Sequence, residues 1–446
     1  MNLRQGLTGE ATAYWHRVRQ FTPNARWIIL SQAVSRLGFG VYQAIFNLFL
    51  LSLGYSTTYV GGLLAFGLYT MAIGALLAGP YTRRVGEKNA LMLSSLISGL
   101  AAAMQVVYPE PAILFFMTIL FNFGVSLQVS SYSPLIAESS TAYERTHLFG
   151  TSQASRIGSS FIGSTIAGFL PGFFSLWLVV PIDSPVTFQI ALILWFIPYI
   201  ISIIPLSFLK HQIPLDAREV IINQHETYGT QETPEPKFRV SIIIRFLIIS
   251  TLIGLGAGLI VPLINVWFWE FYNLPTPLVG LIVATGQATM ATGVLLSPIL
   301  STRIGKVRTV VITQALSLPF IIVLATIVNP YIAIAAYILR NAFMNSGMPV
   351  GTTLRMELVP RRWRSNLAAL NMSAQGFGRA TSVQFAGQLF DQGEYLLPFW
   401  LTFGFYGSQV VLYALFFSKL DTKPSKKPTK NTVELSNDKN EQAFAN

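Results

Sequence analysis

The sequence contains no cysteine and little charge, and each shortage excludes a class of protein. Without cysteine, the chain can form neither disulfide bonds nor thiolate-bound metal sites. Charged residues make up 11% of the chain and hydrophobic residues 52%, whereas soluble proteins carry about 25% charged residues. This composition excludes an ordinary soluble fold and indicates that lipid surrounds most of the chain.

Catalytic and metal-binding residues are also scarce. The four histidines all lie in or beside polar segments: His16, His147, His211 and His225. No Asp or Glu lies clearly in the middle of an apolar run. Hydrolytic or transferase chemistry needs several such groups together, so we expect no enzyme activity, no cofactor and no metal. The net charge of +11 comes from residues beside the apolar runs, so we also expect no nucleic-acid partner.

The second half of the chain repeats the first half without a gap, at an offset of 219 residues (280 − 61 = 219 for Gly61 and Gly280). Parallel hydrophobic repeats are typical of secondary transporters, in which the substrate binds where the two halves meet. The matching pairs include Gly61/Gly280, Gly67/Gly286, Gly74/Gly293, Arg84/Arg303, Gly86/Gly305, Glu138/Glu357 and Gly168/Gly387.

The apolar runs predict an all-α membrane protein. A helix needs about 20 apolar residues to cross the hydrocarbon core, and about twelve such runs can be drawn, which form two six-helix pseudo-repeats. They cover roughly 27–52, 57–80, 89–107, 112–136, 147–171, 185–209, 241–269, 276–300, 308–328, 331–354, 366–390 and 395–418.

Charges beside these runs predict the topology, because Lys and Arg mark cytoplasmic connections. Basic residues occupy one set of connections: Arg83, Arg84, Lys88, Arg303, Lys306, Arg308, Arg361, Arg362 and Arg364. The opposite set carries acids and no Lys or Arg: Glu110, Asp183, Glu270, Asp391 and Glu394. The alternation places both termini in the cytoplasm.

Polar segments divide the chain into five parts. We expect a cytoplasmic N-terminal segment (1–26), a six-helix bundle (27–209), a cytoplasmic linker (210–240), a second bundle (241–418) and a disordered cytoplasmic tail (419–446). No eukaryotic targeting signal is evident, which favours a bacterial plasma (inner) membrane. We expect a monomer that contacts membrane lipid and a small-molecule substrate.

The loop after the second run resembles the signature loop of the major facilitator superfamily, Gly-x-x-x-Asp-Arg-x-Gly-Arg-Arg or Lys. The matching residues, with their counterparts in the repeat, are Gly79, Arg84, Gly86, Lys88, Arg303 and Gly305. The loop after the fourth run, with Glu144-Arg145 and Phe149-Gly150, also resembles the family pattern. The resemblance implies a transporter that works by alternating access and uses the signature loop as a latch. Arg83 stands where the family usually has Asp, so it cannot make the usual latch contact.

Polar residues inside the runs are candidate substrate contacts, because an ionisable group in the membrane costs several kcal/mol. The spacing of Gln32, Arg36, Gln43 and Asn47 places them on one helical face, and the resemblance implies that runs one, four, seven and ten line the cavity. The full set is Gln32, Arg36, Gln43, Asn47, Asn122, Asn265, Gln287, Arg340, Asn341, Asn345, Asn371, Gln375 and Arg379. For Arg156 we instead expect a structural ion pair with Glu138.

Cations without acids inside the membrane favour an anionic substrate, because Arg presents a planar fork suited to carboxylate or phosphate. We therefore expect a secondary active or facilitative transporter, possible substrates being organic anions. Two alternatives stay open on the same fold: an exporter of amphipathic drugs or lipid-like compounds, and a receptor or scaffold without transport. Gly158, Gly163 and Gly168 loosely resemble the glycine-rich helix of the family's drug antiporters, but plain helix packing is the simpler interpretation.

Overall fold

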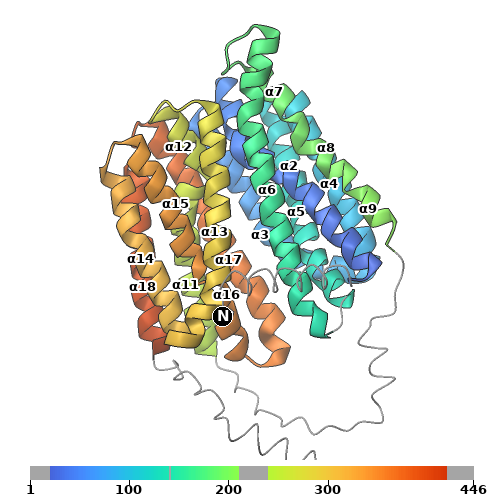
Figure 1. Ribbon diagram of the computed structural model, residues 1–446, viewed down its shortest axis with the longest axis vertical. Helices are drawn as coiled ribbons and strands as arrows, with labels where there is room; N and C mark the ends of the chain where they lie inside the picture. Colours follow the sequence, from blue (N-terminus) through green and yellow to red (C-terminus); the bar gives the residue numbers. More distant parts are fainter. Residues whose placement is uncertain (1–20, 140–141, 210–239, 419–446) are drawn as a thin grey trace, which may run out of the picture.

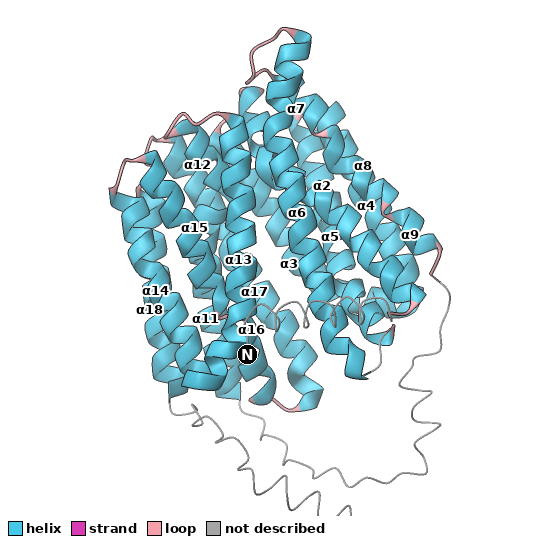
Figure 2. Ribbon diagram, viewed as in Figure 1, coloured by secondary structure: helices cyan, strands magenta, loops and turns pink. Residues whose placement is uncertain are grey.

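The computed structural model describes residues 21–139, 142–209 and 240–418. Every regular element in these residues is a helix, as Figure 2 shows. Residues 1–20, most of the expected linker (210–239) and the expected tail (419–446) lie outside the described residues, as do the side chains of Arg83, Glu138, Arg361, Arg362 and Arg364. An all-α membrane protein with two repeated halves is the predicted fold class, and it is confirmed.

The N-terminal half contains six membrane-crossing segments, five of them single helices. These are α2 (Pro23–Ser52), α3 (Thr57–Val85), α4 (Glu87–Val107), α5 (Pro111–Glu138) and α6 (Ala142–Leu178). The sixth is broken into α7 (Pro185–Ala191), α8 (Ile193–Ile201) and α9 (Ile203–Ser207). The structure extends α6 seven residues beyond the predicted limit of 171 (178 − 171 = 7).

The C-terminal half repeats this order. Its seventh segment consists of α11 (Val240–Ile260), the short η2 (Val261–Leu263) and α12 (Ile264–Glu270), and its tenth of α15 (Pro330–Ser346) and α16 (Met348–Glu357). The others are α13 (Thr276–Ile304), α14 (Lys306–Thr326), α17 (Arg361–Asp391) and α18 (Leu397–Phe417). Figure 1 shows the two halves side by side, with α2 to α9 in blue and green and α11 to α18 in yellow to red.

Local sequence explains several of the helix boundaries. Ser56 accepts a hydrogen bond from the Tyr59 N–H at 3.1 Å and caps α3. Gly86 and its repeat counterpart Gly305 separate α3 from α4 and α13 from α14 with φ of 85° and 93°. These values lie in a region that L side chains rarely adopt, which explains why the repeat keeps glycine at both turns.

Ten of the described segments are long and apolar enough to cross a membrane. The tenth and eleventh segments do not meet this criterion. A break at Gly347 divides the tenth into helices of 17 and 10 residues, and α17 carries too many polar residues for its composition alone to indicate a span. Length and hydropathy therefore support ten of the predicted twelve crossings, and the other two stay predictions.

The two ends of the bundle differ in charge, and we name them accordingly. At the acidic end lie connections 53–56, 108–110, 179–184, 271–275, 327–329 and 392–396, which contain no Lys or Arg. At the basic end lie the turns around Gly86 and Gly305 and the connection 358–360. The positive-inside rule predicts that the basic end faces the cytoplasm.

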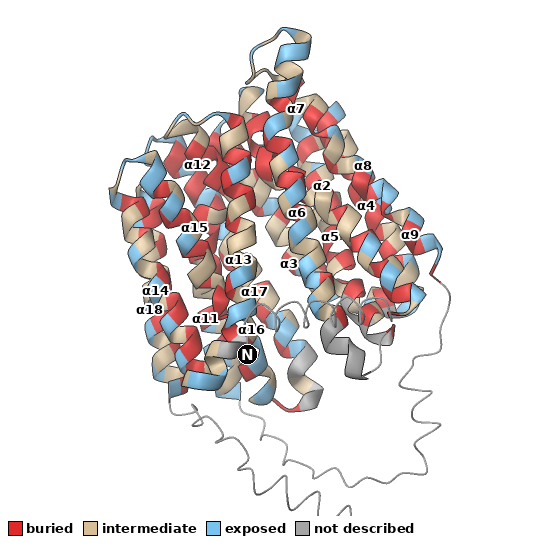
Figure 3. Cartoon of the chain, in the orientation of Figure 1, coloured by how far each residue is buried: buried red, intermediate tan, exposed pale blue. Residues whose placement is uncertain are grey.

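The hydrophobic core joins the halves at the acidic end and divides at the basic end. The largest cluster contains buried residues of both halves, among them Val41, Phe49, Trp267 and Val383. Two further clusters lie toward the basic end, one around Ile28 and Leu206 in the N-terminal half and the other in the C-terminal half. Figure 3 shows buried residues concentrated within and between the helices and exposed residues on the outer faces.

Candidate functional site

Two arginines of the N-terminal half lie close together. Arg36 of α2 is partly exposed, and its guanidinium carbon is 5.0 Å from the centre of the Phe39 ring. Its charge interacts with that of Arg156 on α6 and with the hydroxyls of Tyr132 and Tyr199. Arg156 donates a hydrogen bond to Gln153 at 2.7 Å, while its Nε is buried without a partner in the described residues.

Two arginines of the C-terminal half form a second pair. Arg340 of α15 is 1% exposed, and it donates to Asn341 Oδ1 at 2.9 Å and to the Tyr406 hydroxyl at 3.0 Å. Arg379 of α17 lies near the like charge of Arg340 and the hydroxyl of Tyr406. The Nε atoms of Arg340 and Arg379 are buried and make no hydrogen bond within the described part of the chain.

No carboxylate balances these four charges in the residues that the structure describes. The salt bridge between Lys306 and Glu357 lies apart from them, at the basic end. Among the described residues, the guanidinium groups of Arg36 and Arg379 make no hydrogen bond or ion pair. Holding like charges together away from water costs several kcal/mol unless an anion or a set of acceptors compensates. The two arginine pairs therefore have the charge and the hydrogen-bond donors needed to bind an anion, either at one pair or between the pairs.

Four sequence-predicted amides lie between the halves. Gln287 of α13 donates to Gln43 of α2 at 3.1 Å and to the Ser164 hydroxyl of α6 at 3.2 Å. Closer to the acidic end, Asn47 donates to Asn265 at 3.0 Å and to the Pro262 carbonyl at 2.7 Å. Asn265 in turn donates to the Ala44 carbonyl at 3.1 Å. These hydrogen bonds join α2 and α6 to the C-terminal half.

The other predicted site residues make their contacts within one half. Gln32 accepts a hydrogen bond from Ser152 of α6, and Asn371 accepts one from Ser250 of α11 at 2.6 Å. Asn122 and Asn345 each donate to the carbonyl one turn earlier in their own helices. Gln375 is partly exposed. The predicted polar face of the first segment thus divides, because Gln32 points to its own half whereas Asn47 reaches the other.

The predicted signature-loop residues lie at the basic end. Gly79, Arg83 and Arg84 belong to the last turns of α3, with Arg84 exposed. Lys88 donates to the carbonyls of Ser207 and Leu209 at 3.1 and 2.7 Å, which ties α4 to the end of the sixth segment. The repeat counterpart of this loop contains Arg303 and Gly305, and there Lys306 bonds Glu357. The expected pairing of Arg156 with Glu138 stays a prediction, since the Glu138 side chain lies outside the described set.

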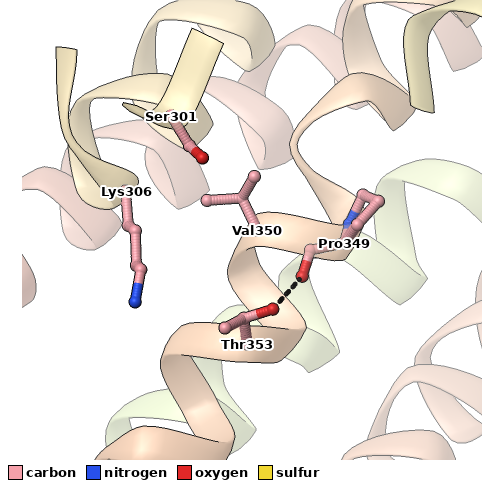
Figure 4. Close-up of a pocket in the computed structure, with 5 residues that line it drawn as sticks. All are labelled: Ser301, Lys306, Pro349, Val350 and Thr353. Atoms are coloured by element: carbon pink, nitrogen blue, oxygen red, sulfur yellow. Dashed lines mark hydrogen bonds between the residues drawn. The ribbon is translucent and has the colours of Figure 1, made fainter. Parts of the chain in front are cut away.

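A small pocket opens among α13, α14 and α16 at the basic end, and Figure 4 shows its residues. Thr353 donates to the Pro349 carbonyl at 3.1 Å, and Lys306 is engaged by Glu357. The pocket lies within the C-terminal half and contains none of the predicted site residues. It is lined by Ser301, Lys306, Pro349, Val350 and Thr353.

A family model described as Major Facilitator Superfamily matches residues 28–227 and 246–443. The two matches cover most of both repeats. The chain belongs to the major facilitator superfamily. It is thus an integral membrane protein of a family of small-molecule transporters, as the resemblance of the signature loop predicts. No characterised protein matches the chain closely enough in sequence to count as a relative.

Solved structures of several transporters share the fold. A bacterial homologue of the human lysosomal transporter Spinster, inward-facing and occupied, is 12% identical with a TM-score of 0.69, over 90% of this chain and 98% of that chain. A D-xylose–proton symporter is 17% identical with a TM-score of 0.68, over 90% and 99%. The nucleoside transporter NupG is 14% identical with a TM-score of 0.64, over 90% and 100%. At these identities the likeness shows the fold of the superfamily alone.

Sequence reasoning missed the tyrosines beside the arginines in this superfamily member. Tyr132 and Tyr199 are 4% and 1% exposed and lie near Arg36, and Tyr406 bonds Arg340. Tyrosine is too common in apolar spans to stand out by itself. The predicted Asn122 and Asn341 occupy equivalent repeat positions (341 − 122 = 219), each against a repeated glycine, so the repeat marks this pair but gives no such signal for the tyrosines.

Proposed function

We propose that this transporter carries small organic anions by alternating access, with the arginine pairs Arg36–Arg156 and Arg340–Arg379 as the binding groups. The observation that carries the proposal is the presence of four guanidinium groups without a described carboxylate partner. A guanidinium holds a carboxylate or phosphate through two parallel hydrogen bonds. One pair in each half lets the anion contact both halves, as rocking about a central site requires.

The sidedness of the cycle follows from the charge pattern. The basic end faces the cytoplasm, so a conformer joined at the acidic end is inward-facing. The protein resides in a bacterial inner membrane and works as a monomer. Coupling to protons through a buried carboxylate has no support among the described residues, so uniport or anion exchange is the transport mode we propose.

Transport by purified protein in proteoliposomes tests the proposal. We expect uptake of at least one member of a panel of monocarboxylates, dicarboxylates and phosphate esters, and none of a neutral sugar or an organic cation of similar size. Arg340→Gln and Arg379→Gln should lower the rate about 100-fold or more, since each charge-assisted bidentate contact contributes about 3 kcal/mol.

Arg245→Gln is the matched control for this experiment. Arg245 is exposed on α11, where its guanidinium lies 5.3 Å from the Phe416 ring, outside both pairs. Its removal should leave anion transport unchanged. Equal transport by the parent, Arg340→Gln and Arg379→Gln proteins would remove the arginines from the mechanism, and drug export without anion transport would favour the alternative of an amphipathic-compound exporter.

A further inference from the structure

At the acidic end, a carboxylate of one half closes on the start of a helix of the other half. Asp391 is the last residue of α17, and its Oδ1 accepts hydrogen bonds from the Thr57 N–H at 2.8 Å and from the Thr57 hydroxyl. Its Oδ2 accepts from the Thr58 N–H at 2.9 Å. Thr57 and Thr58 begin α3, where the N–H groups lack partners within the helix and carry the positive end of its dipole.

Contact between the backbones of α3 and α17 keeps this carboxylate in place. A Cβ on Gly387 would lie 2.4 Å from the Thr57 carbonyl oxygen and 3.1 Å from the Gly61 Cα. The two helices therefore touch without intervening side chains one turn from Asp391. When the acidic end opens, α3 and α17 separate, and all the hydrogen bonds of Asp391 to α3 are lost together.

The repeat supplies an internal comparison. The equivalent helix–helix contact in the repeat joins α13 and α6, where a Cβ on Gly168 would lie 2.9 Å from the Gly280 Cα. There, Thr276 is the counterpart of Thr57 (276 − 57 = 219), and Gly172 is the counterpart of Asp391 (391 − 172 = 219). The Thr276 hydroxyl is buried and makes no hydrogen bond within the described residues. The α3–α17 contact thus has a carboxylate at the helix start, whereas position 172 of the α13–α6 contact has glycine instead.

The described titratable groups that face Asp391 carry no positive charge, so the start of α3 is its positive partner. Glu270 and Tyr395 face it from α12 and from the connection before α18, and the Tyr395 hydroxyl donates to Glu270 at 3.2 Å. Burial raises the pKa of Asp391, but the hydrogen bonds from Thr57 and Thr58 outweigh burial and hold the pKa below its ordinary value. Because the pKa is lowered, the bonded carboxylate is charged at neutral pH, and acid that protonates it would weaken these bonds.

We infer that Asp391 is a one-sided latch that biases this transporter toward the conformation closed at the acidic end. The inference rests on the alternating access proposed above. The latch also gives a meaning to the residue at the other end of α3, where Arg83 stands in place of the usual acid of the signature loop. With that acid missing at the basic end and a carboxylate bound at the acidic end, α3 stabilises the inward-facing state more than the outward-facing one.

The distance between the two halves at the acidic end tests the latch without any substrate. The chain has no cysteine, so spin labels can be attached at Glu110→Cys and Val328→Cys, two exposed positions in different halves. In lipid nanodiscs at pH 7, Asp391→Asn should raise the ratio of long to short distances about tenfold or more, because charge-assisted hydrogen bonds are lost. Asp183→Asn removes an acid of the same end that has no hydrogen bond in the described residues, and should leave the distances unchanged.

A second variant tests the latch by adding a copy of it. Gly172→Asp places a carboxylate beside the unpaired Thr276 hydroxyl, and a Cβ at Gly172 meets only Ile182 at an ordinary 3.5 Å. This variant should lower the long-distance fraction below that of the parent. Unchanged distances in Asp391→Asn, or a shift as large in Asp183→Asn, would overturn the latch. Because no anion is present, either result is independent of the outcome of the transport assay.

Discussion

Among the residues, Arg379 most directly distinguishes a binding role from a structural one. Its guanidinium makes no hydrogen bond within the described residues, its Nε is buried, and the like charge of Arg340 acts on it. A residue kept for stability would be paired. A cation shielded from water without a partner destabilises the fold, and the anion binding proposed above would offset this cost.

Replacing Arg379 with Met should therefore leave stability unchanged or raise it by about 1 kcal/mol, because repulsion from Arg340 is removed and no partner is orphaned. The same variant should lose the rise in Tm that a transported anion gives the parent, since a ligand stabilises only the state that binds it. Thermal unfolding in detergent, with and without the anion, measures both. A fall in Tm of several degrees without ligand would instead assign Arg379 a structural role.

Among the elements, the fifth segment shows how one run of glycines serves different contacts. A Cβ on Gly163 would lie 2.1 Å from the Leu37 carbonyl oxygen of α2, and one on Gly168 would meet α13 of the other half. A Cβ on Gly158 would meet nothing within 4 Å. The packing interpretation thus holds for Gly163 and Gly168, and close helix approach is its physical basis.

The pair Gly163→Ala and Gly158→Ala tests this difference. Gly163→Ala should destabilise the protein by about 1–3 kcal/mol, because α2 and α6 must move apart. Gly158→Ala should be neutral or stabilise by up to about 1 kcal/mol, because alanine favours the helix and enters open space. Thermal unfolding of the two variants measures the contrast, and equal effects would show that the α2–α6 contact is not limiting for stability.

In the whole molecule, the division of charge between the two ends predicts the orientation in the membrane. The connections at the acidic end carry no Lys or Arg, and the basic end carries them in both repeats. The positive-inside rule is a statement about insertion, so it predicts the orientation of the described conformer without reference to the substrate.

Single-cysteine labelling in intact cells checks this orientation, because the parent chain provides no background thiol. A membrane-impermeant maleimide should label Glu110→Cys, at the acidic end, in intact cells. It should label Asn89→Cys, exposed near the start of α4, only after the cells are permeabilised. The reverse pattern would invert the predicted topology and make the described conformer outward-facing.

The sequence alone determined the outline of the architecture: most of the spans, the repeat and the family resemblance follow from local composition and from an offset that can be read directly. Glycine was predictable at Gly86 and Gly305 because the turn itself demands positive φ. The partners of the polar residues were decided by tertiary structure. Gln32 and Asn47 share a helix and a spacing pattern, yet one bonds within its half and the other across, because helix rotation and crossing set those contacts. Asp391 meets Thr57 across 334 residues, and no local pattern encodes that distance.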